Sequence, residues 1–535
     1  MLRITDLQLP LDHAEDALKA AVLKELGITE KELINFTVFR RSYDARKKTA
    51  IILIYTIDVE TTNEAALLAS HRNRTKLSET PDTSYKFVTH ADNKPFKRPV
   101  VIGFGPCGLF VALLLAEMGF NPIVLERGKT VRERTKDTWG LWRKRELKPE
   151  SNVQFGEGGA GTFSDGKLYS QIKDPKHYGR KVLTEFVKAG APEEIMYVSK
   201  PHIGTFRLVK MIEEMRHNIE ALGGEIRFEQ KVTDIDIVDG KVQGVQLNDG
   251  EYIETAHVVL AIGHSARDTF KMIADRGVYV EAKPFSIGFR VEHPQSVIDK
   301  ARFGPNAGNK ILGAADYKLV HHAKNGRSVY SFCMCPGGTV VAATSEPGRV
   351  VTNGMSQYSR NERNANSAIV VGITPADYPG NPLAGIDLQR ALEEKAYEVG
   401  GGNYNAPGQL VGDFLAARPS TALGTVEPSY KPGITLCDLA TVLPEFAITA
   451  IREALPEFEK KIKGFAMKDA ILTGVETRTS SPIRIKRNDG DLQSLNTRGL
   501  FPAGEGAGYA GGILSAAVDG IRVAEAVALD IQANA

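Results

Sequence analysis

Residues 99–126 read PVVIGFGPCGLFVALLLAEMGFNPIVLE, and this stretch decides the fold of the chain. The short β-branched run at residues 100–102 predicts a buried parallel strand. Gly103, Gly105 and Gly108 follow at the spacing that allows a sharp turn, a close approach of a phosphate to the backbone, and tight packing of the next helix. The stretch therefore predicts a strand, a glycine turn and a helix.

A carboxylate follows the second strand of this strand–turn–helix–strand unit. The helix expected over residues 109–118 ends at Gly119, and its unpaired N-terminal N–H groups would face the phosphates. The apolar strand at residues 123–125 then delivers Glu126, whose two oxygens can accept hydrogen bonds from the hydroxyls of an adenosine ribose. A negative charge at this place disfavours a 2′-phosphate, so NADP is the poorer fit.

Glycine spacing alone is weak evidence, because 51 of the 535 residues are glycine. The same spacing recurs at Gly156, Gly158 and Gly161 and again at Gly506, Gly508 and Gly511. The stretch that begins at Gly103 is distinguished by the strand before it, the helix after it and the acid at the expected distance. We therefore expect the dinucleotide to bind there.

Length and composition limit the class of protein. A chain of 535 residues with 42% hydrophobic residues can bury a large core and suggests two or three domains. Its net charge of +2 gives no reason to expect nucleic acid or an anionic membrane as partner. The longest apolar runs are too short to span a bilayer and no signal peptide precedes them, so we expect a soluble, cytoplasmic protein.

Four cysteines are too few and too scattered for a disulfide framework or a zinc ribbon, so we expect no metal. They are Cys107, Cys333, Cys335 and Cys437. Cys333 and Cys335 are two apart, which on a strand places both thiols on one face. A redox pair and ordinary packing of two small apolar side chains both remain open.

Residues 1–92 are expected to form a separate domain of the ferredoxin-like type, with the order βαββαβ. Its strands are predicted at residues 2–9, 35–40, 50–58 and 85–89, and its helices at residues 14–26 and 63–69. The basic segment RRSYDARKK at residues 40–48 is either a solvated hairpin tip or a docking patch for an acidic partner or RNA. Tyr43 is its one aromatic residue, and residues 91–98 are expected to be a linker.

The remaining chain divides around an insertion. Hairpin turns predict a β-meander over residues 232–255, followed by an apolar strand at residues 256–262 that runs into Gly263. Residues 278–496 change to mixed strands, loops and helices and are the expected substrate domain. The chain closes with a short strand, the glycine-rich run GEGAGYAGG and an apolar helix over residues 513–529.

These pieces together resemble the FAD-binding flavoproteins of the glutathione reductase structural type. The likeness is greatest to the bacterial group labelled uncharacterised FAD-dependent dehydrogenases, on the phrases RRSYDARKK, GEGGAGTFSDGKL, SFCMCPGG and VETRTSSPIRI. It covers essentially the whole chain. It implies an α/β Rossmann-like FAD-binding domain, a central parallel sheet plus a β-meander, made from residues 98–277 and 497–535. An α+β substrate domain at residues 278–496 would be inserted in it, after the N-terminal ferredoxin-like α+β domain at residues 1–92.

The resemblance also implies which residues hold FAD. Glu126 would bind the adenosine ribose, Arg127 would lie beside the phosphates, and Glu505 would contact the flavin chain, where Asp is commoner. The glycines before the last helix would lie near the flavin ring. The full expected set is Gly103, Gly105, Pro106, Gly108, Glu126, Arg127, Gly158, Gly159, Ala160, Gly161, Thr162, Ala261, Gly263, Gly504, Glu505, Gly511, Gly512 and Ile513.

Catalytic candidates follow from position. His264 lies just past a strand end at the expected ligand crevice and is the preferred proton donor. Arg478 and Ser480, in the polar run ETRTSSP, are the preferred substrate contacts, since an arginine can clamp a carboxylate with two hydrogen bonds. Weaker candidates of the same kinds are His202, His293, Arg290 and Arg484.

Three functions are compatible with these features. The first is an FAD-dependent oxidoreductase, a dehydrogenase or reductase that exchanges hydride or electrons between flavin N5 and an unidentified small organic substrate. No dedicated NAD domain is expected, and NAD(P)H is one candidate for a transient electron donor. The alternatives are an FAD-dependent RNA-modifying enzyme and a non-catalytic flavin-binding scaffold or sensor. A disulfide reductase of this type would need a CxxxxC pair, but only Cys107 lies on the helix after the fingerprint.

Overall fold

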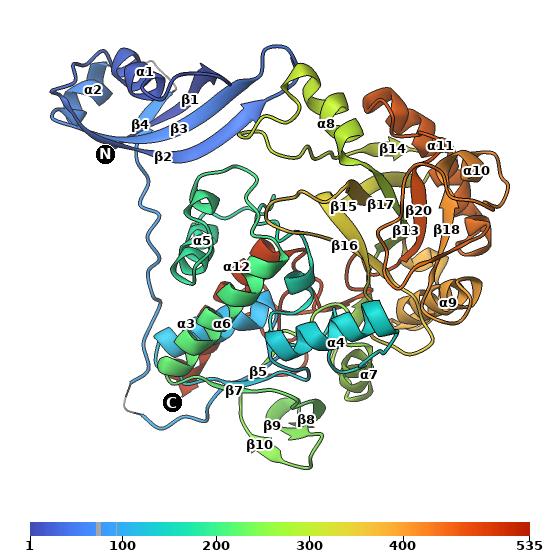
Figure 1. The fold of residues 1–535 in the computed structure, drawn as a ribbon. Coiled ribbons are helices and arrows are strands. Elements are labelled where there is room, and N and C mark those ends of the chain that lie inside the picture. The colour runs from blue at the N-terminus through green and yellow to red at the C-terminus, as the bar shows by residue number, and fades with distance from the viewer. Residues whose placement is uncertain (71–75, 93, 535) are drawn as a thin grey trace.

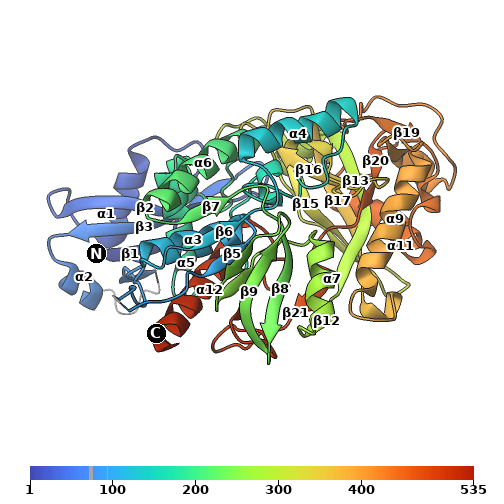
Figure 2. The same ribbon diagram turned by 90° about the horizontal axis from the view of Figure 1, so that it is seen from below.

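The computed structural model describes residues 1–70, 76–92 and 94–534. Within these residues the chain has a mixed α/β fold, which confirms the class predicted from the sequence. Figure 1 shows an N-terminal region, a region built on a parallel sheet and a region built on a large, mainly antiparallel sheet. In Figure 2 the parallel sheet lies between the other two regions.

The N-terminal region is a four-stranded antiparallel sheet with the order β2-β3-β1-β4. Its strands are β1 (Leu2–Pro10), β2 (Leu33–Asp44), β3 (Ile52–Thr61) and β4 (Leu77–Glu79), and its helices are α1 (Ala17–Leu26) and α2 (Glu64–Ser70). The strand expected at residues 85–89 is wrong. Residues 85–89 form no strand, and the segment is tied to the last helix instead, because the Tyr85 hydroxyl donates a 3.0 Å hydrogen bond to Glu525. Its apolar residues Phe87 and Val88 are exposed.

The hairpin between β2 and β3 carries the basic segment, and it contacts the rest of the chain. Arg46 pairs with Asp44 on the same hairpin, and the Lys48 carbonyl accepts a 2.6 Å hydrogen bond from the Asn306 amide. Tyr43 packs edge-on against Phe303, with 5.9 Å between ring centroids. Tyr43 is therefore engaged within the chain and is not a free stacking surface for a base.

The parallel sheet has the order β22-β11-β5-β6-β7, and every neighbouring pair in it is parallel. Its strands are β5 (Val100–Ile102), β6 (Ile123–Leu125), β7 (Glu225–Arg227), β11 (Val258–Leu260) and β22 (Leu500–Pro502). β5, β6, β11 and β22 are buried runs of mostly β-branched or apolar residues, as expected for parallel strands covered on both faces. Strands from both ends of the chain thus meet in one sheet.

Helix α3 (Pro106–Glu117) packs against the last helix, α12 (Ile513–Asn534). All of its residues from Cys107 to Ala116 are buried, which explains why its sequence is apolar on every side. An ideal Cβ on Gly520 would lie 2.4 Å from the Cys107 carbonyl oxygen, so glycine is required where the two helices cross. This contact holds the C-terminal helix beside the glycine turn.

The other elements of this region flank the parallel sheet. They are α4 (Val131–Lys144), α5 (Tyr178–Lys188), α6 (Thr205–Ala221) and α7 (Arg267–Asp275), with the three-stranded antiparallel meander β8 (Val232–Val238), β9 (Lys241–Leu247) and β10 (Tyr252–Glu254). A two-stranded ribbon of β12 (Val280–Ala282) and β21 (Ile483–Ile485) leads into and out of the large-sheet region.

The large sheet has eight strands in the order β14-β15-β17-β13-β20-β18-β19, with β16 paired to β15. They are β13 (Phe285–Pro294), β14 (Val320–His322), β15 (Ser328–Ala342), β16 (Thr352–Ser356), β17 (Asn364–Ile373), β18 (Ala406–Leu410), β19 (Ile434–Leu436) and β20 (Ile471–Glu476). The accompanying helices are α8 (Gln295–Phe303), α9 (Ala384–Val399), α10 (Val411–Leu415) and α11 (Glu445–Lys461). Strands β13 and β20 are buried along nearly their whole length, so this sheet forms a second core.

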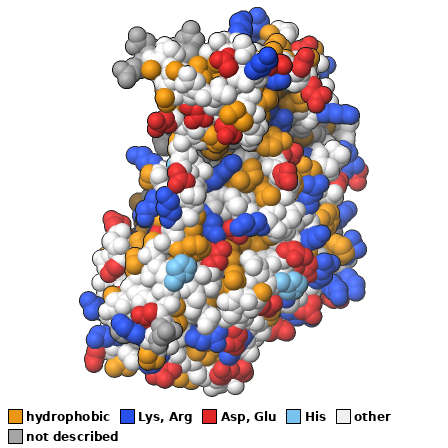
Figure 3. Space-filling model, turned by 90° about the vertical axis from the view of Figure 1, so that its left-hand side faces the viewer, with side chains coloured by type: hydrophobic (Ala, Val, Ile, Leu, Met, Phe, Trp, Pro, Cys, Tyr) orange, Lys and Arg blue, Asp and Glu red, His pale blue; other side chains and the backbone are white. Residues whose placement is uncertain are grey.

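The surface shows no separation of charge on the face drawn in Figure 3, where basic and acidic side chains are interspersed. This agrees with the small net charge of +2. Among the helices of the described residues, none combines the length and the apolar character that crossing a bilayer requires.

Candidate active site

A cavity of about 580 Å³ lies where the parallel sheet meets the large sheet. One wall contains Phe104, Glu126, Ala261 and Ala503, which directly follow or lie next to the carboxyl ends of β5, β6, β11 and β22. Ligands of open parallel sheets bind at this edge. The large sheet contributes to the opposite wall, for example through Cys333 on β15. The volume falls in the usual range for small-molecule and cofactor sites.

The glycine turn at this edge is constrained on every side. Gly103 has φ +95°, and an ideal Cβ there would lie 2.5 Å from the Ala261 carbonyl oxygen. A Cβ on Gly108 would lie 2.0 Å from the Gly103 carbonyl oxygen, so a side chain would force the helix off the strand. A Cβ on Gly159, with φ +61°, would lie 2.8 Å from the Gly105 Cα. The two glycine loops therefore touch through their backbones and form part of the cavity wall.

Glu126 is only 4% exposed and lies in the cavity wall. Its Oε2 accepts the Phe104 N–H at 2.9 Å, and its Oε1 accepts the N–H groups of Gly128 and Gly156, each at 2.9 Å. A carboxylate offers about four acceptor positions, so one position on Oε2 is left for a ligand hydroxyl. The side chain thus fixes the turn after β5 and the second glycine loop, and can still bind a ribose.

Arg134 organises the loop at residues 152–157, and sequence reasoning missed it. Its side chain is fully buried and donates to the carbonyl oxygens of Asn152 at 2.7 Å, Val153 at 2.8 Å and Glu157 at 2.7 Å. Burial lowers the pKa of this guanidinium to about 10, so it stays charged at neutral pH. The residue lies in a polar stretch with no diagnostic spacing. Its partners are backbone carbonyl groups, which every residue has, so the sequence does not identify them.

Glu505 and the start of the last helix lie at another part of the cavity wall. An ideal Cβ on Gly511 or Gly512 would meet nothing within 4 Å, so a flat ligand can approach this backbone closely. Helix α12 begins at Ile513, and the positive end of its dipole faces the same space. This end of the cavity favours a ligand that carries or develops negative charge.

The ionisation of Glu505 predicts a pH dependence of stability. Burial raises the pKa of this carboxyl from 4.5 to about 7, while Lys283 opposes the shift. Because the folded protein holds a proton that the unfolded chain releases, stability should fall as the pH rises from about 4.5 to about 7. We expect Glu505→Gln to remove this part of the slope in unfolding midpoints measured across that range. An unchanged slope in the variant would show that Glu505 is not the group that titrates.

His264 lies in the cavity wall, and its hydrogen bonds define its tautomer. Its Nδ1 lies 2.9 Å from the Ser265 hydroxyl. That hydroxyl donates to Gln154 Oε1 at 3.1 Å and accepts from Arg478 at 3.2 Å, while the Gln154 amide is oriented by donating to the Ala343 carbonyl at 2.9 Å. The hydroxyl can then only accept from His264, so Nδ1 carries the hydrogen and Nε2 is left as an acceptor.

The same surroundings keep His264 neutral. Burial lowers the pKa of the imidazole to about 3, and the charges of Arg478 and Arg267 add to this effect. A neutral ring with hydrogen on Nδ1 offers an acceptor at Nε2 and not an acidic proton. In this geometry the ring is suited to accept a hydrogen bond, whereas its role as a proton donor stays a prediction.

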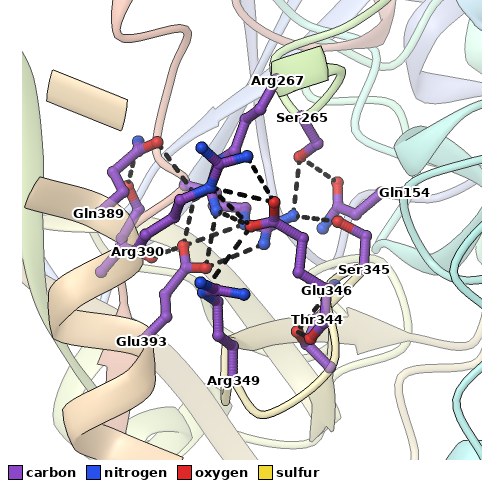
Figure 4. Close-up of polar contacts among 12 residues, drawn as sticks. Gln154, Ser265, Arg267, Thr344, Ser345, Glu346, Arg349, Gln389, Arg390 and Glu393 are labelled. Carbon is purple, nitrogen blue, oxygen red and sulfur yellow. Dashed lines mark hydrogen bonds and ion pairs between the residues drawn. The ribbon is translucent and has the colours of Figure 1, made fainter. Parts of the chain in front are cut away.

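Arg478 belongs to a buried ionic cluster that joins the two sheet regions. Figure 4 labels other members of this cluster, among them Arg267 and Glu393. The Nε and Nη2 of Arg478 donate to Glu393 at 3.1 and 3.0 Å, and its Nη1 donates to the hydroxyls of Ser265 and Ser345. Arg267 pairs with Glu393 from the other side at 2.6 Å. Four of the five N–H groups of Arg478 are thus used within the protein, which leaves little capacity to clamp a substrate carboxylate.

Two other expected site residues make contacts that the sequence did not predict. Arg127 lies at the cavity wall, but its guanidinium pairs with Glu150 at 2.6 Å and with Asp268 at 2.9 Å. Ser480 does not line the cavity, and its hydroxyl accepts a 3.1 Å hydrogen bond from Lys283. Polar character in the sequence near Ser480 reflects contacts inside the protein.

The structure brings most of the expected FAD residues to one cavity. Those in its wall are Gly103, Gly105, Pro106, Glu126, Arg127, Gly159, Ala160, Gly161, Ala261, Gly263, Glu505, Gly511, Gly512 and Ile513. Four others, Gly108, Gly158, Thr162 and Gly504, are not in the wall. Of these, Gly504 is packed against Cys107, since a Cβ there would lie 2.8 Å from the Cys107 Cβ.

The chemistry of the cavity fits FAD. A carboxylate with one open acceptor position lies in the wall, as a ribose requires. Two helix N-termini, those of α3 and α12, supply unpaired N–H groups for phosphates and for a ring that becomes negative. An ideal Cβ on Gly263, Gly511 or Gly512 would meet nothing within 4 Å, which leaves bare backbone for close approach.

Three segments of the chain match known families. Residues 284–479 match the family described as FAD-dependent protein, C-terminal domain-like, and residues 148–276 match flavin containing amine oxidoreductase. Residues 1–60 match a domain of unknown function. A protein of Clostridium beijerinckii, described as an uncharacterized protein, is 48% identical over 526 residues, which are 98% of this chain and 98% of that protein.

The solved structures that resemble this chain are more distant. Amadoriase I from Aspergillus fumigatus is 12% identical, with a TM-score of 0.36 over 82% of this chain and 88% of that chain. The L-amino acid deaminase from Proteus vulgaris is 12% identical, with a TM-score of 0.37 over 83% of this chain and 96% of that chain. Likeness at this level carries no information about the substrate.

The two flavin-related family matches, together with a cavity whose chemistry fits FAD, define the class. The protein is an FAD-dependent oxidoreductase, and FAD is its cofactor. More narrowly, the chain belongs to the same family as the Clostridium beijerinckii protein.

Proposed function

We propose that this protein exchanges a hydride or electrons between a small organic substrate and N5 of FAD, without a dedicated NAD domain. The observation that carries this proposal is the position of the cavity, which is bounded by the glycine turns on one side and by the large sheet on the other. Bound FAD supplies the two-electron chemistry. The large sheet therefore lies where a substrate-binding region would face the bound cofactor.

We also propose that FAD lies as in the glutathione reductase structural type. The parallel order β22-β11-β5-β6-β7 beside the meander β10-β9-β8 supports this arrangement. Glu126 would hold the adenosine ribose, while Glu505, Gly511 and Gly512 would lie at the flavin end. In this arrangement the N-terminal region takes no direct part in binding the cofactor.

His264 is the residue proposed to act on a donor group in the cavity. Its Nε2 is unprotonated and its ring is held by Ser265, which Gln154 and Arg478 orient in turn. A fixed acceptor of this kind can orient an O–H or N–H group of the substrate. We assign Arg478 a positioning role, because it acts on the cavity through Ser265.

The source and destination of the electrons are also proposed. A second strand and helix with their own glycine fingerprint and acid are not found in the sequence, so a nicotinamide would have to react transiently at the flavin face. A substrate that reduces the flavin directly is the simpler arrangement. NAD(P)H remains the alternative donor that the test below distinguishes.

The test is a screen of flavin bleaching. Protein purified with FAD should absorb at about 450 nm, and this band should bleach under anaerobic conditions with one class of donor among amines, hydroxy acids, thiols and NAD(P)H. We expect His264→Ala to slow bleaching by that donor roughly 100-fold. Because the pKa of His264 is lowered to about 3, the wild-type rate should show no transition near pH 6.5 that depends on this residue.

The control for this variant is His217→Ala, on the exposed face of α6 and outside the cavity wall. It should bleach at the wild-type rate. Bleaching of His264→Ala at the control rate would remove the role of His264 but leave the oxidoreductase proposal intact. Protein that binds FAD but is bleached by no donor, even at high concentration, would overturn the proposed reaction.

A further inference from the structure

Two cysteines lie on one strand, and one of them, Cys333, lines the cavity. Neither takes part in the chemistry described so far. Cys333 and Cys335 lie on β15, which is irregular at this point, since its pairing with β17 shifts register between Phe332 and Cys335. Cys333 also has φ +44°, a left-handed conformation that costs energy in a residue other than glycine. Such irregularities re-aim side chains and are frequent next to active sites.

The two cysteines are close together but differ in exposure. The Cys335 thiol donates a hydrogen bond to the Cys333 carbonyl oxygen at 3.3 Å. Cys335 is completely buried, whereas Cys333 is partly exposed and lines the cavity. A reagent or cofactor in the cavity can therefore reach the Cys333 sulfur, while Cys335 lies two residues further along the same strand.

Two cations, the buried Arg290 and the partly exposed Lys167, lie beside this pair. Arg290 donates to the Cys333 carbonyl oxygen at 3.1 Å, and the ammonium group of Lys167 donates to the Met334 carbonyl oxygen. The hydrogen bond from Cys335 lowers the pKa of the Cys333 thiol, burial opposes this, and both cations assist it. The hydrogen bond and burial raise the pKa of Cys335. One accessible thiolate beside one buried thiol is the arrangement of a reactive dithiol.

Cys333 shares the cavity wall with the proposed flavin end. Burial raises the pKa of Glu505, and the charge of Cys333 adds to this effect. Cys333, Glu505 and Gly512 all lie in the wall of the same cavity. The sulfur of Cys333 is thus on the side of the cavity where the proposed function puts the reactive ring.

We propose that Cys333 and Cys335 form a redox dithiol that exchanges two electrons with bound FAD, an inference that rests on the proposed function. In the oxidising direction, two S–H bonds break and one S–S bond forms between the two residues. The two electrons and two protons that leave the sulfurs reduce FAD to FADH2. The reverse reaction restores both thiols and oxidises the flavin.

The experiment counts electrons in the FAD-loaded protein. After mild oxidation, anaerobic titration with dithionite should consume about four electrons per FAD in the wild type and about two in Cys333→Ser, Cys335→Ser and the double variant. Cys437→Ser, whose thiol lies outside the cavity wall, should still take up about four. Uptake of about two electrons by the wild type as well would overturn the proposal.

A second readout does not depend on the cofactor. Apoprotein oxidised with diamide and then alkylated should keep Cys333 and Cys335 unlabelled and linked, in a peptide about 2 Da lighter by mass spectrometry than its reduced form. Full alkylation of both thiols after this treatment would count against the pair. A failure of the dithiol proposal can be distinguished from a failure of the proposed function. If the protein takes up about two electrons per FAD, the flavin is still reduced and the proposed oxidoreductase function stands without the dithiol.

Discussion

Replacing Glu126 by alanine should weaken FAD binding by a factor of about 10 to 100, the loss expected for hydrogen bonds to a charged acceptor. The substitution removes the open acceptor position meant for the ribose. It also leaves the N–H groups of Phe104, Gly128 and Gly156 without their carboxylate partner, so both glycine loops lose their common anchor. Titration of apoprotein with FAD, followed by quenching of flavin fluorescence, measures the change.

Two further variants separate the ribose contact from a general loss of charge. Glu126→Gln keeps an acceptor oxygen but replaces the other with a donor, so its affinity should fall between wild type and alanine. Glu150→Ala removes a nearby carboxylate that pairs with Arg127 and lies outside the cavity wall, and it should bind FAD as wild type does. Tight binding by Glu126→Ala would mean that the adenosine end lies elsewhere.

Residues whose positions are fixed by local backbone geometry could be predicted from the sequence. Gly103 and Gly108 stand where a Cβ would collide with backbone, and Glu126 follows the next strand at a set distance, so their spacing together with the strand before and the helix after locates them. The glycines of the second loop and of the last helix were predicted from the resemblance to flavoproteins. A Cβ on Gly511 or Gly512 would meet nothing within 4 Å, so packing does not require glycine there.

Residues that act through tertiary contacts could not be predicted. Arg134 binds four carbonyl oxygens, and Gln154 orients Ser265, but in the sequence each is an ordinary polar residue of the kind usually found at the surface. The polar run at residues 476–482 predicted two substrate contacts, of which Arg478 lines the cavity and Ser480 does not. Burial and partners decide such cases, and both depend on residues far away in the chain.

Glu393→Ala should destabilise the protein by about 3–5 kcal/mol, because it leaves two buried guanidinium groups without their carboxylate. Glu393 is fully buried between Arg267 and Arg478, which come from opposite sides of the boundary between the two sheet regions. Thermal unfolding followed by tryptophan fluorescence is a suitable measurement, since Trp142 on α4 donates to the Ala342 carbonyl of β15 across this boundary. Glu346→Ala removes a more exposed partner of Arg267 and should cost about 1 kcal/mol or less.

The pH dependence of this loss has a definite sign. Burial by itself would raise the pKa of Glu393, but the charges of Arg267 and Arg478 lower it below its ordinary value of 4.5. A depressed pKa contributes stability above the pKa of the unfolded chain and loses it on acidification. The difference between wild type and Glu393→Ala should therefore be full at pH 7 and shrink below about pH 4.5. A difference that is the same at pH 4 and pH 7 would contradict a charged Glu393.

A triple variant distinguishes the cost of orphaned charge from the value of the ion pairs themselves. Buried ion pairs contribute little net stability when apolar side chains of similar size replace every member. Adding Arg267→Met and Arg478→Met to Glu393→Ala should therefore restore more than half of the lost stability. In the triple variant the His264 ring should no longer be held in one orientation. Residue 478 no longer donates to Ser265, so the Ser265 hydroxyl is free to reorient. If stability recovers but flavin bleaching stays slow, the cluster positions Ser265 and His264. If stability and the bleaching rate both recover, the role of the cluster is purely structural.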